Sequence, residues 1–230
     1  MKILTLTGAG ISAESGIPTF RDANGLWEGH RLEDVATPEA FQRDPDLVHH
    51  FYNERRRQLQ HPSIEPNPAH FALAEFEHQH QDEFLLVTQN IDNLHRRAGS
   101  QRIVAMHGEL LKARCIDSGA IFDWTDDLNR STVHPGNPDS VGRLRPHVVW
   151  FGEMPLGLDE IHEAAAEADL FIAIGTSAVV YPAAAIVEWT QASCRRIEIN
   201  LDATPRSPMF DQSIRGKASV EVPKFLASLR

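Results

Sequence analysis

A short apolar run that ends in a glycine turn is the feature that most constrains the fold of this chain. The run Ile3–Thr7 is followed by Gly8-Ala9-Gly10-Ile11-Ser12-Ala13. Glycines in such a turn let the backbone approach a dinucleotide pyrophosphate, and the N-terminus of a following helix favours the anion. Ala13 can pack that helix on the strand. The segment therefore predicts a phosphate cradle at the end of the first strand.

Length and charge narrow the classes of function. The chain has 230 residues, enough for one substantial domain with a smaller lobe. Its net charge of −10 argues against nucleic acid as a partner, whereas an acidic surface would suit a lysine-rich protein substrate. We expect a monomer that acts on proteins.

The cysteines and the apolar runs bear on location. Cys115 and Cys194 lie far apart and form neither a disulfide framework nor a paired-cysteine zinc signature, which fits a reducing compartment. The longest apolar run, Leu170–Tyr181, is too short to span a bilayer. The first predicted strand begins almost at Met1, so we expect no leader peptide and a cytoplasmic location.

Apolar strand-like runs alternate with helical patterns along much of the chain. Helices are predicted at Leu158–Ala168, Pro182–Gln191 and Val222–Leu229. This alternation predicts an α/β fold with a Rossmann-like, doubly wound parallel sheet. The predicted strands are Ile3–Thr7, Phe84–Thr88, Ile103–Met106, Leu170–Ile174 and Arg196–Ile199, with a weaker one around Ala218–Val220.

Two insertions interrupt the alternation and predict a smaller lobe. Residues 27–81 form a helical insertion, because Thr37-Pro38, Asp44-Pro45 and Asn67-Pro68 each resemble a helix cap followed by a first turn. Residues 111–150 form a small antiparallel β module, with strands at Lys112–Cys115 and Ile121–Trp124 and a loop at His134–Gly142. The expected large lobe is 1–26, 82–110 and 151–230, and the small lobe is 27–81 and 111–150.

Polar or glycine-rich segments follow five of the predicted strands. In open α/β sheets ligands bind beyond the carboxyl ends of the strands, so these segments predict one site at one edge. An ordinary dehydrogenase would need a complete βαβ unit and an acidic residue after the second strand. Here Pro18 ends the predicted helix early and Asp22 lies in a loop, so the chain keeps the phosphate cradle but not the rest of the dehydrogenase motif. The five segments are Gly8–Gly10, Gln89–Asp92, His107-Gly108, Gly175–Ser177 and Asn200–Asp202.

Together these blocks resemble the sirtuins, the NAD-dependent protein lysine deacylases, in order from residue 3 to about residue 220. The resemblance implies NAD as a co-substrate and acyl-lysine proteins as partners. The matching blocks are Gly8–Ser12, Gly16-Ile-Pro-Thr-Phe-Arg-Asp22, Thr88–Asp92, His107-Gly108, Phe151–Glu153, Gly175–Ser177 and Ile199-Asn200.

The resemblance also implies roles for particular residues. His107 would act as general base on a ribose hydroxyl, which suits a side chain that titrates near neutral pH. Phe20 would shield the reactive face and Arg21 would hold a loop on the cofactor, while Phe151-Gly152-Glu153 would pair with the substrate backbone. The implied cofactor-binding residues are Gly8, Ala9, Gly10, Ser12, Ala13, Phe20, Arg21, Gln89, Asn90, Ile91, Asp92, Gly175, Thr176, Ser177, Asn200, Leu201, Asp202 and Ala218.

Simpler interpretations stay open beside these roles. His107 could be a strand-end histidine that caps a turn, and Asn90 and Asp92 could cap a helix over Ile91–Ala98. The whole cleft could also belong to a sensor of NAD or ADP-ribose, or to a protein ADP-ribosyltransferase.

One predicted helix, Asp46–Leu59, bears on the acyl group. Val48, Tyr52, Arg55 and Leu59 fall on one face of it, so Arg55 lies where an apolar residue is expected. A buried guanidinium needs an anion, either an internal carboxylate or that of a substrate. Alternatively, Arg55 belongs to a solvated arginine run. By resemblance, Tyr-x-x-Arg here is the signature of sirtuins that remove succinyl and malonyl groups, and bacterial members also remove acetyl groups.

The chain departs from the family's pattern at the structural zinc. Cys115 stands at the first ligand position, but Ser118 replaces the second, and residues 129–145 contain no cysteine. Asp117, Asp126 and His134 would add only scattered ligands to one thiolate, which makes a poor zinc site. We expect no zinc.

Overall fold

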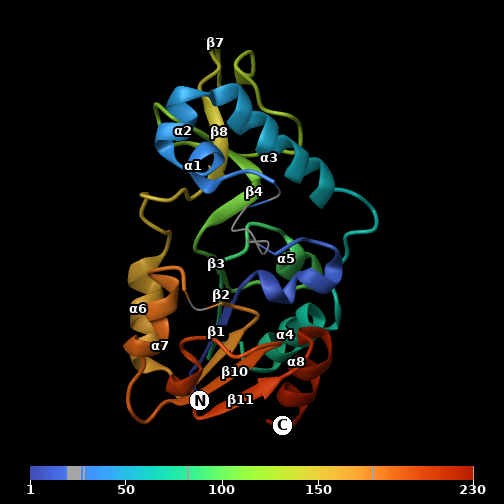
Figure 1. Ribbon diagram of the computed structural model, residues 1–230, viewed down its shortest axis with the longest axis vertical. Coiled ribbons are helices and arrows are strands. Elements are labelled where there is room, and N and C mark those ends of the chain that lie inside the picture. Colours follow the sequence, from blue (N-terminus) through green and yellow to red (C-terminus); the bar gives the residue numbers. More distant parts are fainter. Residues whose placement is uncertain (20–26, 28, 82, 178, 230) are drawn as a thin grey trace.

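The computed structural model describes residues 1–19, 27, 29–81, 83–177 and 179–229 (Figure 1). Phe20 and Arg21 lie outside the described residues. A six-stranded parallel sheet has the order β11-β10-β9-β1-β2-β3. The α/β, Rossmann-like fold class is therefore confirmed. The strands are β1 (Ile3–Thr7), β2 (Phe84–Thr88), β3 (Ile103–Ala105), β9 (Leu170–Ile174), β10 (Arg195–Asn200) and β11 (Gln212–Arg215).

Helices cover both faces of this sheet. On one face lie α4 (Pro68–Gln79) and α8 (Ala218–Ala227), and on the other α6 (Leu158–Glu167) and α7 (Ile186–Trp189). Each residue of β1 and β9 is buried, because strands covered on both faces are apolar throughout. The sheet therefore holds its carboxyl-end turns on a rigid base.

Helix α4 differs from the expected lobe assignment. Its residues fall in the segment expected to build the small lobe, but Leu73 and Phe76 belong to the core between the large sheet and α8. The apolar face of α4 is buried by the sheet, so the segment 27–81 contributes to both lobes.

The small lobe joins three helices to an antiparallel sheet of order β5-β4-β8, at the opposite end of the molecule from the chain termini (Figure 1). The predicted caps form, since Thr37 accepts a hydrogen bond from the Ala40 amide and Asp44 from the Leu47 amide. The elements are α1 (Leu32–Val35), α2 (Pro38–Arg43), α3 (Pro45–Leu59), β4 (Gly108–Cys115), β5 (Ile121–Asp123) and β8 (Leu144–Val148).

Several predicted elements are wrong in detail. The sixth strand is β11, whereas Ala218–Val220 opens α8. The expected loop at His134–Gly142 is largely a hairpin of β6 (Val133–His134) and β7 (Asn137–Val141). β11 is polar and mostly exposed at the sheet edge, so it lacks the apolar run that identifies a strand.

The glycine turn also differs from the expected helix start. It leads into two short 3-10 turns, η1 (Ala9–Ile11) and η2 (Ala13–Ser15). Ala13 is exposed rather than packed on the strand. Further short elements are α5 (Leu94–Ala98), η3 (Ala183–Ala185) and η4 (Ser207–Met209). None of the helices among the described residues has the length and apolarity to cross a membrane.

Candidate active site

The glycine turn after β1 packs directly on the turn after β9. The Gly8 amide donates to the Ile174 carbonyl at 3.0 Å, and the Gly10 amide to the Gly175 carbonyl at 2.8 Å. A Cβ on Gly10 would lie 2.7 Å from the Gly175 Cα, which is closer than real side chains come. The glycines thus let two loops meet at the sheet edge, a close approach that the sequence pattern did not reveal.

The turn after β2 is bonded to the same glycine turn. Asn90 Nδ2 donates to the Gly8 carbonyl and to Ser12 Oγ, both at 3.1 Å. Ser12 Oγ in turn donates to Asp92 Oδ2 at 2.9 Å, and Asp92 Oδ1 accepts the Leu94 amide at 3.0 Å. Asp92 therefore bonds the first amide of α5, whose N-cap position is Asn93, and the helix begins at Leu94 rather than at Ile91.

Burial shifts the pKa of Asp92. It raises the pKa of this carboxyl, although the hydrogen bonds from Leu94 and Ser12 oppose the rise. A raised pKa at a sheet edge where several loops converge is typical of functional sites.

His107 follows β3 and is fixed in one useful orientation. Its Nδ1 lies 2.9 Å from the Gln89 carbonyl oxygen, which can only accept, so Nδ1 carries the proton. Nε2 is then the acceptor of the ring. Burial lowers the pKa of His107, and the hydrogen bond to Gln89 only partly offsets this. A neutral imidazole with a free acceptor nitrogen can work as a general base.

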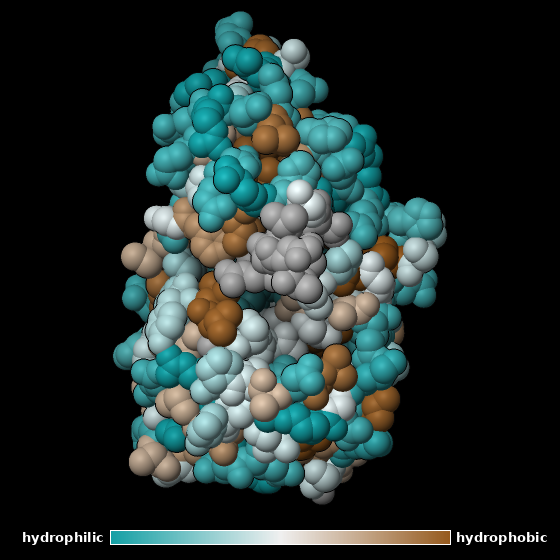
Figure 2. Space-filling model, in the orientation of Figure 1, coloured by the Kyte–Doolittle hydropathy of each residue, from teal (hydrophilic) through white to brown (hydrophobic). Residues whose placement is uncertain are grey.

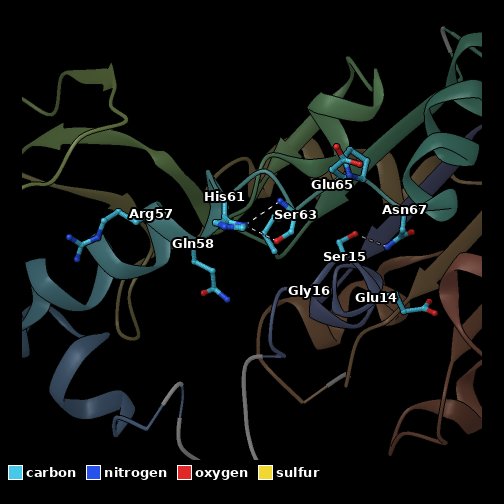
Figure 3. Close-up of a pocket in the computed structure, with 11 residues that line it drawn as sticks. Glu14, Ser15, Gly16, Arg57, Gln58, His61, Ser63, Glu65 and Asn67 are labelled. Atoms are coloured by element: carbon cyan, nitrogen blue, oxygen red, sulfur yellow. Dashed lines mark hydrogen bonds between the residues drawn. The ribbon is translucent and has the colours of Figure 1, made fainter.

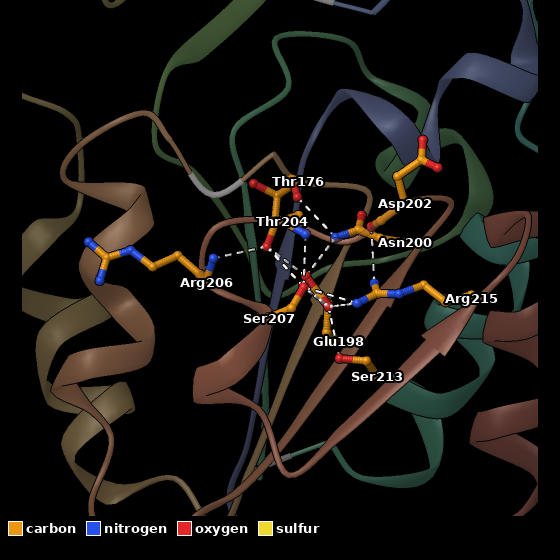
Figure 4. A network of polar contacts seen from close by, with 9 residues as sticks. All are labelled: Thr176, Glu198, Asn200, Asp202, Thr204, Arg206, Ser207, Ser213 and Arg215. Carbon is orange, nitrogen blue, oxygen red and sulfur yellow. Dashed lines mark hydrogen bonds and ion pairs between the residues drawn. The ribbon is translucent and has the colours of Figure 1, made fainter.

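A second polar network lies behind the turns after β9 and β10 (Figure 4). Thr176 links the turn after β2 to the end of β10. Gln89 Nε2 donates to the Thr176 hydroxyl at 2.9 Å, and Asn200 Nδ2 donates to the Thr176 carbonyl at 3.0 Å. At the centre of the network lies the carboxylate of Glu198, which is 1% exposed. It accepts hydrogen bonds from Asn200, Thr204, Ser207 and Ser213 and pairs with Arg215.

Sequence reasoning missed Glu198. The available signal was a carboxylate between Ile197 and Ile199, within a predicted strand of the central sheet. Other residues expected on this side are more peripheral: Ser177, Leu201 and Asp202 are exposed, and Ala218 is buried at the start of α8.

Tyr52 and Arg55 both lie on the buried face of α3, as the periodicity predicts. Tyr52 is completely buried, and its hydroxyl accepts a hydrogen bond from the Trp150 indole at 3.0 Å. The Arg55 side chain is only 11% exposed. Its Nη1 donates to the Phe51 carbonyl at 2.7 Å, and its guanidinium lies 3.5 Å from the centre of the Phe51 ring.

The neighbouring arginines do not form one solvated run. Arg56 is fully buried, donating to the Leu110 carbonyl and to Asn53 Oδ1, and burial lowers its pKa to about 10. The side chain of Arg57 is 57% exposed. Sequence reasoning missed Arg56, because the helical pattern gives no sign that β4 covers it.

The segment Phe151–Glu153 is a turn after β8 rather than a strand. The Phe151 amide donates to the Ala36 carbonyl at 2.9 Å. The Glu153 carboxylate binds Arg145 at 2.6 and 2.9 Å and also accepts the Trp150 amide.

Figure 2 shows hydrophobic side chains gathered between the two lobes on one face, where exposed apolar surface indicates a binding region.

An ion pair joins the strands near Cys115, where the sequence departs from the expected zinc pattern. Arg143 Nε donates to Asp117 Oδ2 at 2.7 Å and so joins the start of β8 to the end of β4. Cys115 is buried with Ala113, Leu128 and Leu144. Within the part of the chain that the structure describes, no three His, Cys, Asp or Glu side chains are grouped to hold a metal ion.

A cavity of about 880 Å³ lies between η2 and the C-terminal end of α3 (Figure 3). Asn67 forms part of its wall and ties the glycine turn to α4, donating to the Ile11 carbonyl at 2.7 Å and to Ser15 Oγ at 3.0 Å. His107 and the turns after β2, β9 and β10 do not line this cavity.

A parallel sheet whose carboxyl-end turns share hydrogen bonds, with a second lobe beside that edge, defines the class of nucleotide-binding α/β enzymes. Comparison with known families identifies the group within that class. Residues 8–182 match the model described as the Sir2 family. The chain belongs to the Sir2 family.

Curated relatives are similar over nearly the whole chain. An NAD-dependent protein deacylase of Rhodopirellula baltica is 66% identical over 233 residues, covering 98% of each chain. One of the same name from Escherichia coli K12 is 56% identical over 230 residues, covering 99% of this chain and 82% of the relative.

Solved structures agree with this family. A Sir2 homologue in complex with NAD has a TM-score of 0.87 at 40% identity, covering all of this chain and 89% of that one. An ADP-ribose complex of a mutant Sir2 homologue has a TM-score of 0.89 at 38% identity, covering 100% and 92%. The recognition of a sirtuin from sequence blocks is therefore confirmed.

Proposed function

We propose that this Sir2-family enzyme, an NAD-dependent protein deacylase, removes succinyl and malonyl groups from lysine side chains as well as acetyl groups. The observation that carries the acyl preference is the guanidinium of Arg55, 11% exposed on the same helix face as the Tyr52 hydroxyl. Its carboxylate neighbour Glu54 lies 3.5 Å away and is half exposed, so water screens that pair. A carboxylate at the end of an acyl chain would meet a desolvated cation and a phenol together.

The residues of the site fit NAD as the co-substrate. Gln89 and Asn90 from the turn after β2 and Asn200 from the end of β10 bond to the turns after β9 and β1, and Asp92 joins them through Ser12. NAD supplies the ADP-ribosyl acceptor for the acyl group and nicotinamide as the leaving group. We assign Asn90 and Asp92 to the nicotinamide side, and Gly175, Thr176, Ser177, Asn200 and Ala218 to the adenosine side.

His107 is the proposed general base. Its Nδ1–H is held by the Gln89 carbonyl, so Nε2 can accept a proton from a ribose hydroxyl. After the amide oxygen of the acyl-lysine has displaced nicotinamide from the ribose, that hydroxyl attacks the acyl carbon. Water then completes the release of lysine and 2′-O-acyl-ADP-ribose. A sensor of NAD or ADP-ribose would have no use for a histidine fixed in this tautomer, which favours an enzyme.

One assay separates the candidate functions. The protein is incubated with NAD and a succinyl- or acetyl-lysine peptide, and products are identified by mass spectrometry. A deacylase gives nicotinamide and acyl-ADP-ribose. A sensor gives neither, and a protein ADP-ribosyltransferase gives nicotinamide and modified protein without acyl-ADP-ribose.

The acyl preference is tested with Arg55→Met. One charge-assisted hydrogen bond is worth roughly 1.5–3 kcal/mol, so kcat/KM for the succinyl peptide should fall about 10- to 100-fold. The kcat/KM for the acetyl peptide should change little. Arg57→Met on the exposed side of the same helix is the control. An equal loss of both activities would mean that the pocket is assigned wrongly.

Two further properties remain proposals. We propose that the small lobe folds without zinc, because the Asp117–Arg143 pair and the core around Cys115 join its strands. Stoichiometric zinc in the purified protein by elemental analysis would overturn this.

The buried free thiols of Cys115 and Cys194 suit the reducing cytoplasm, where we propose that the enzyme acts.

A further inference from the structure

The hydroxyl of Tyr52 has a fixed partner 98 residues away in the sequence. The Trp150 indole nitrogen lies 3.0 Å from Tyr52 Oη, and both side chains are buried, at 2% and 0% exposed. An indole N–H can only donate, so the phenol oxygen accepts this bond. Among the residues that the structure describes, no side chain accepts a bond from the phenol hydrogen. The hydrogen is therefore directed away from Trp150.

Trp150 is itself held from several sides. The Arg145 guanidinium lies 3.3 Å from the centre of its indole ring, and the Phe41 ring centre lies 5.2 Å away. Its amide donates to Glu153 Oε2 at 2.8 Å. Arg145 also binds both oxygens of Glu153 and donates to the Val148 carbonyl at 2.8 Å. The indole is thus clamped by a partly buried ion pair, and it has little freedom to release the phenol.

The phenol keeps its hydrogen. Burial raises the pKa of Tyr52 well above its ordinary value, although the Trp150 bond and the nearby charges of Arg145 and Arg55 oppose the rise. Glu153 pairs with both Arg145 and Arg114, and on the helix that carries Tyr52 the nearby cation is Arg55. The phenol can therefore act as a donor beside that cation.

We propose that Trp150 is a positioning residue for acyl selectivity: its indole N–H fixes the Tyr52 hydroxyl so that the phenol hydrogen is presented to an acidic acyl group. Trp150 acts through Tyr52 and not by touching the carboxylate. The inference rests on the proposed function, in which Tyr52 and Arg55 bind that carboxylate. It adds a specificity determinant on the segment between β8 and Glu153, far from α3 in sequence.

The test compares kcat and KM on matched succinyl- and acetyl-lysine peptides for the wild type, Trp150→Phe, Tyr52→Phe and the double variant. Trp150→Phe should lower kcat/KM for the succinyl peptide about fivefold, chiefly through KM, which corresponds to one neutral hydrogen bond. The acetyl peptide should change less than about twofold. In the Tyr52→Phe background, Trp150→Phe should have no further effect on the ratio of the two rates.

Two additional variants separate packing from hydrogen bonding. Site-specific replacement of Trp150 by benzothienylalanine keeps the shape of the ring but lacks the N–H donor. It should show the selectivity change expected of Trp150→Phe, and it still tests the hydrogen bond if Trp150→Phe folds poorly. Trp189→Phe, on α7 beside His162, controls for the loss of an indole elsewhere.

The outcomes distinguish this inference from the proposed function. Equal losses on both peptides, or independent effects of Trp150→Phe and Tyr52→Phe on the ratio, would overturn the positioning role. If Tyr52→Phe and Arg55→Met both leave the succinyl-to-acetyl ratio unchanged, the proposed acyl site itself fails.

Discussion

Replacing Glu198 by glutamine should weaken both the fold and NAD binding. Glu198 Oε1 accepts bonds from Asn200 Nδ2 and Thr204 Oγ1, and Oε2 from Ser207 and Ser213 while pairing with Arg215. The hydroxyls can reverse their bonds, but the two nitrogen donors cannot. Whichever way the new amide turns, its NH₂ faces either Asn200 or Arg215.

The magnitude follows from these contacts. A hydrogen bond to a charged group contributes about 1.5–3 kcal/mol, and one or two are lost here. Arg215 is one-third exposed and can turn to water, which limits the loss. We expect a destabilisation of about 2–3 kcal/mol, or roughly 4–12 °C in Tm for a chain of this size. KM for NAD should rise severalfold, because Asn200 also holds the Thr176 carbonyl.

The pH dependence adds a sharper test. Burial raises the pKa of Glu198, but the hydrogen bonds from Ser207, Thr204 and Ser213, with Arg215, outweigh it, so the net pKa lies below its ordinary value. A carboxyl with a lowered pKa stabilises the fold above its unfolded pKa and loses this contribution as the pH falls through the folded value. The Tm difference between wild type and variant should therefore be full at pH 7 and shrink below about pH 4.

The measurements are thermal unfolding at several pH values and steady-state kinetics with varied NAD. Glu167→Gln is the control, because its pair with Lys2 is exposed and should contribute less than about 1 kcal/mol. A Glu198→Gln protein with the wild-type Tm, or with a Tm loss that does not depend on pH, would refute the reasoning.

Three further predictions follow from single contacts. Gly10→Ala should abolish NAD binding in calorimetry, because its Cβ would strike the Gly175 backbone at 2.7 Å, whereas Gly136→Ala meets only ordinary contacts and should bind normally. Arg56→Met should lower the free energy of unfolding, measured in urea, by about 2–3 kcal/mol, and exposed Arg57→Met should lower it by less than about 1 kcal/mol. Equal losses for the two variants would contradict the role given to burial. Burial lowers the pKa of His107 below 6.5, so kcat/KM of deacylation should fall only as the pH drops through that lowered pKa. A fall of kcat/KM that begins above pH 6.5 would exclude His107 as the base.

Much of the sheet could be predicted because its signals are local. β1, β2 and β9 have the predicted bounds, since each is a continuous apolar run closed by a turn. The Pro-initiated helices α2, α3 and α4 begin as predicted, because the cap and the first proline are adjacent in sequence. β11 could not be found this way, because an edge strand with one exposed side needs no apolar run.

By itself, the sequence determined the fold class, the order of the polar turns and the family, because strands, caps and glycine turns are encoded within a few residues. Only the tertiary structure decided how those turns are bonded, which face α4 covers and what surrounds each charge. Glu198 and Arg56 are ordinary ionisable residues in the sequence, and they become buried centres only when distant segments cover them. The Trp150–Tyr52 bond joins residues 98 positions apart, so it exists only once the small lobe is assembled.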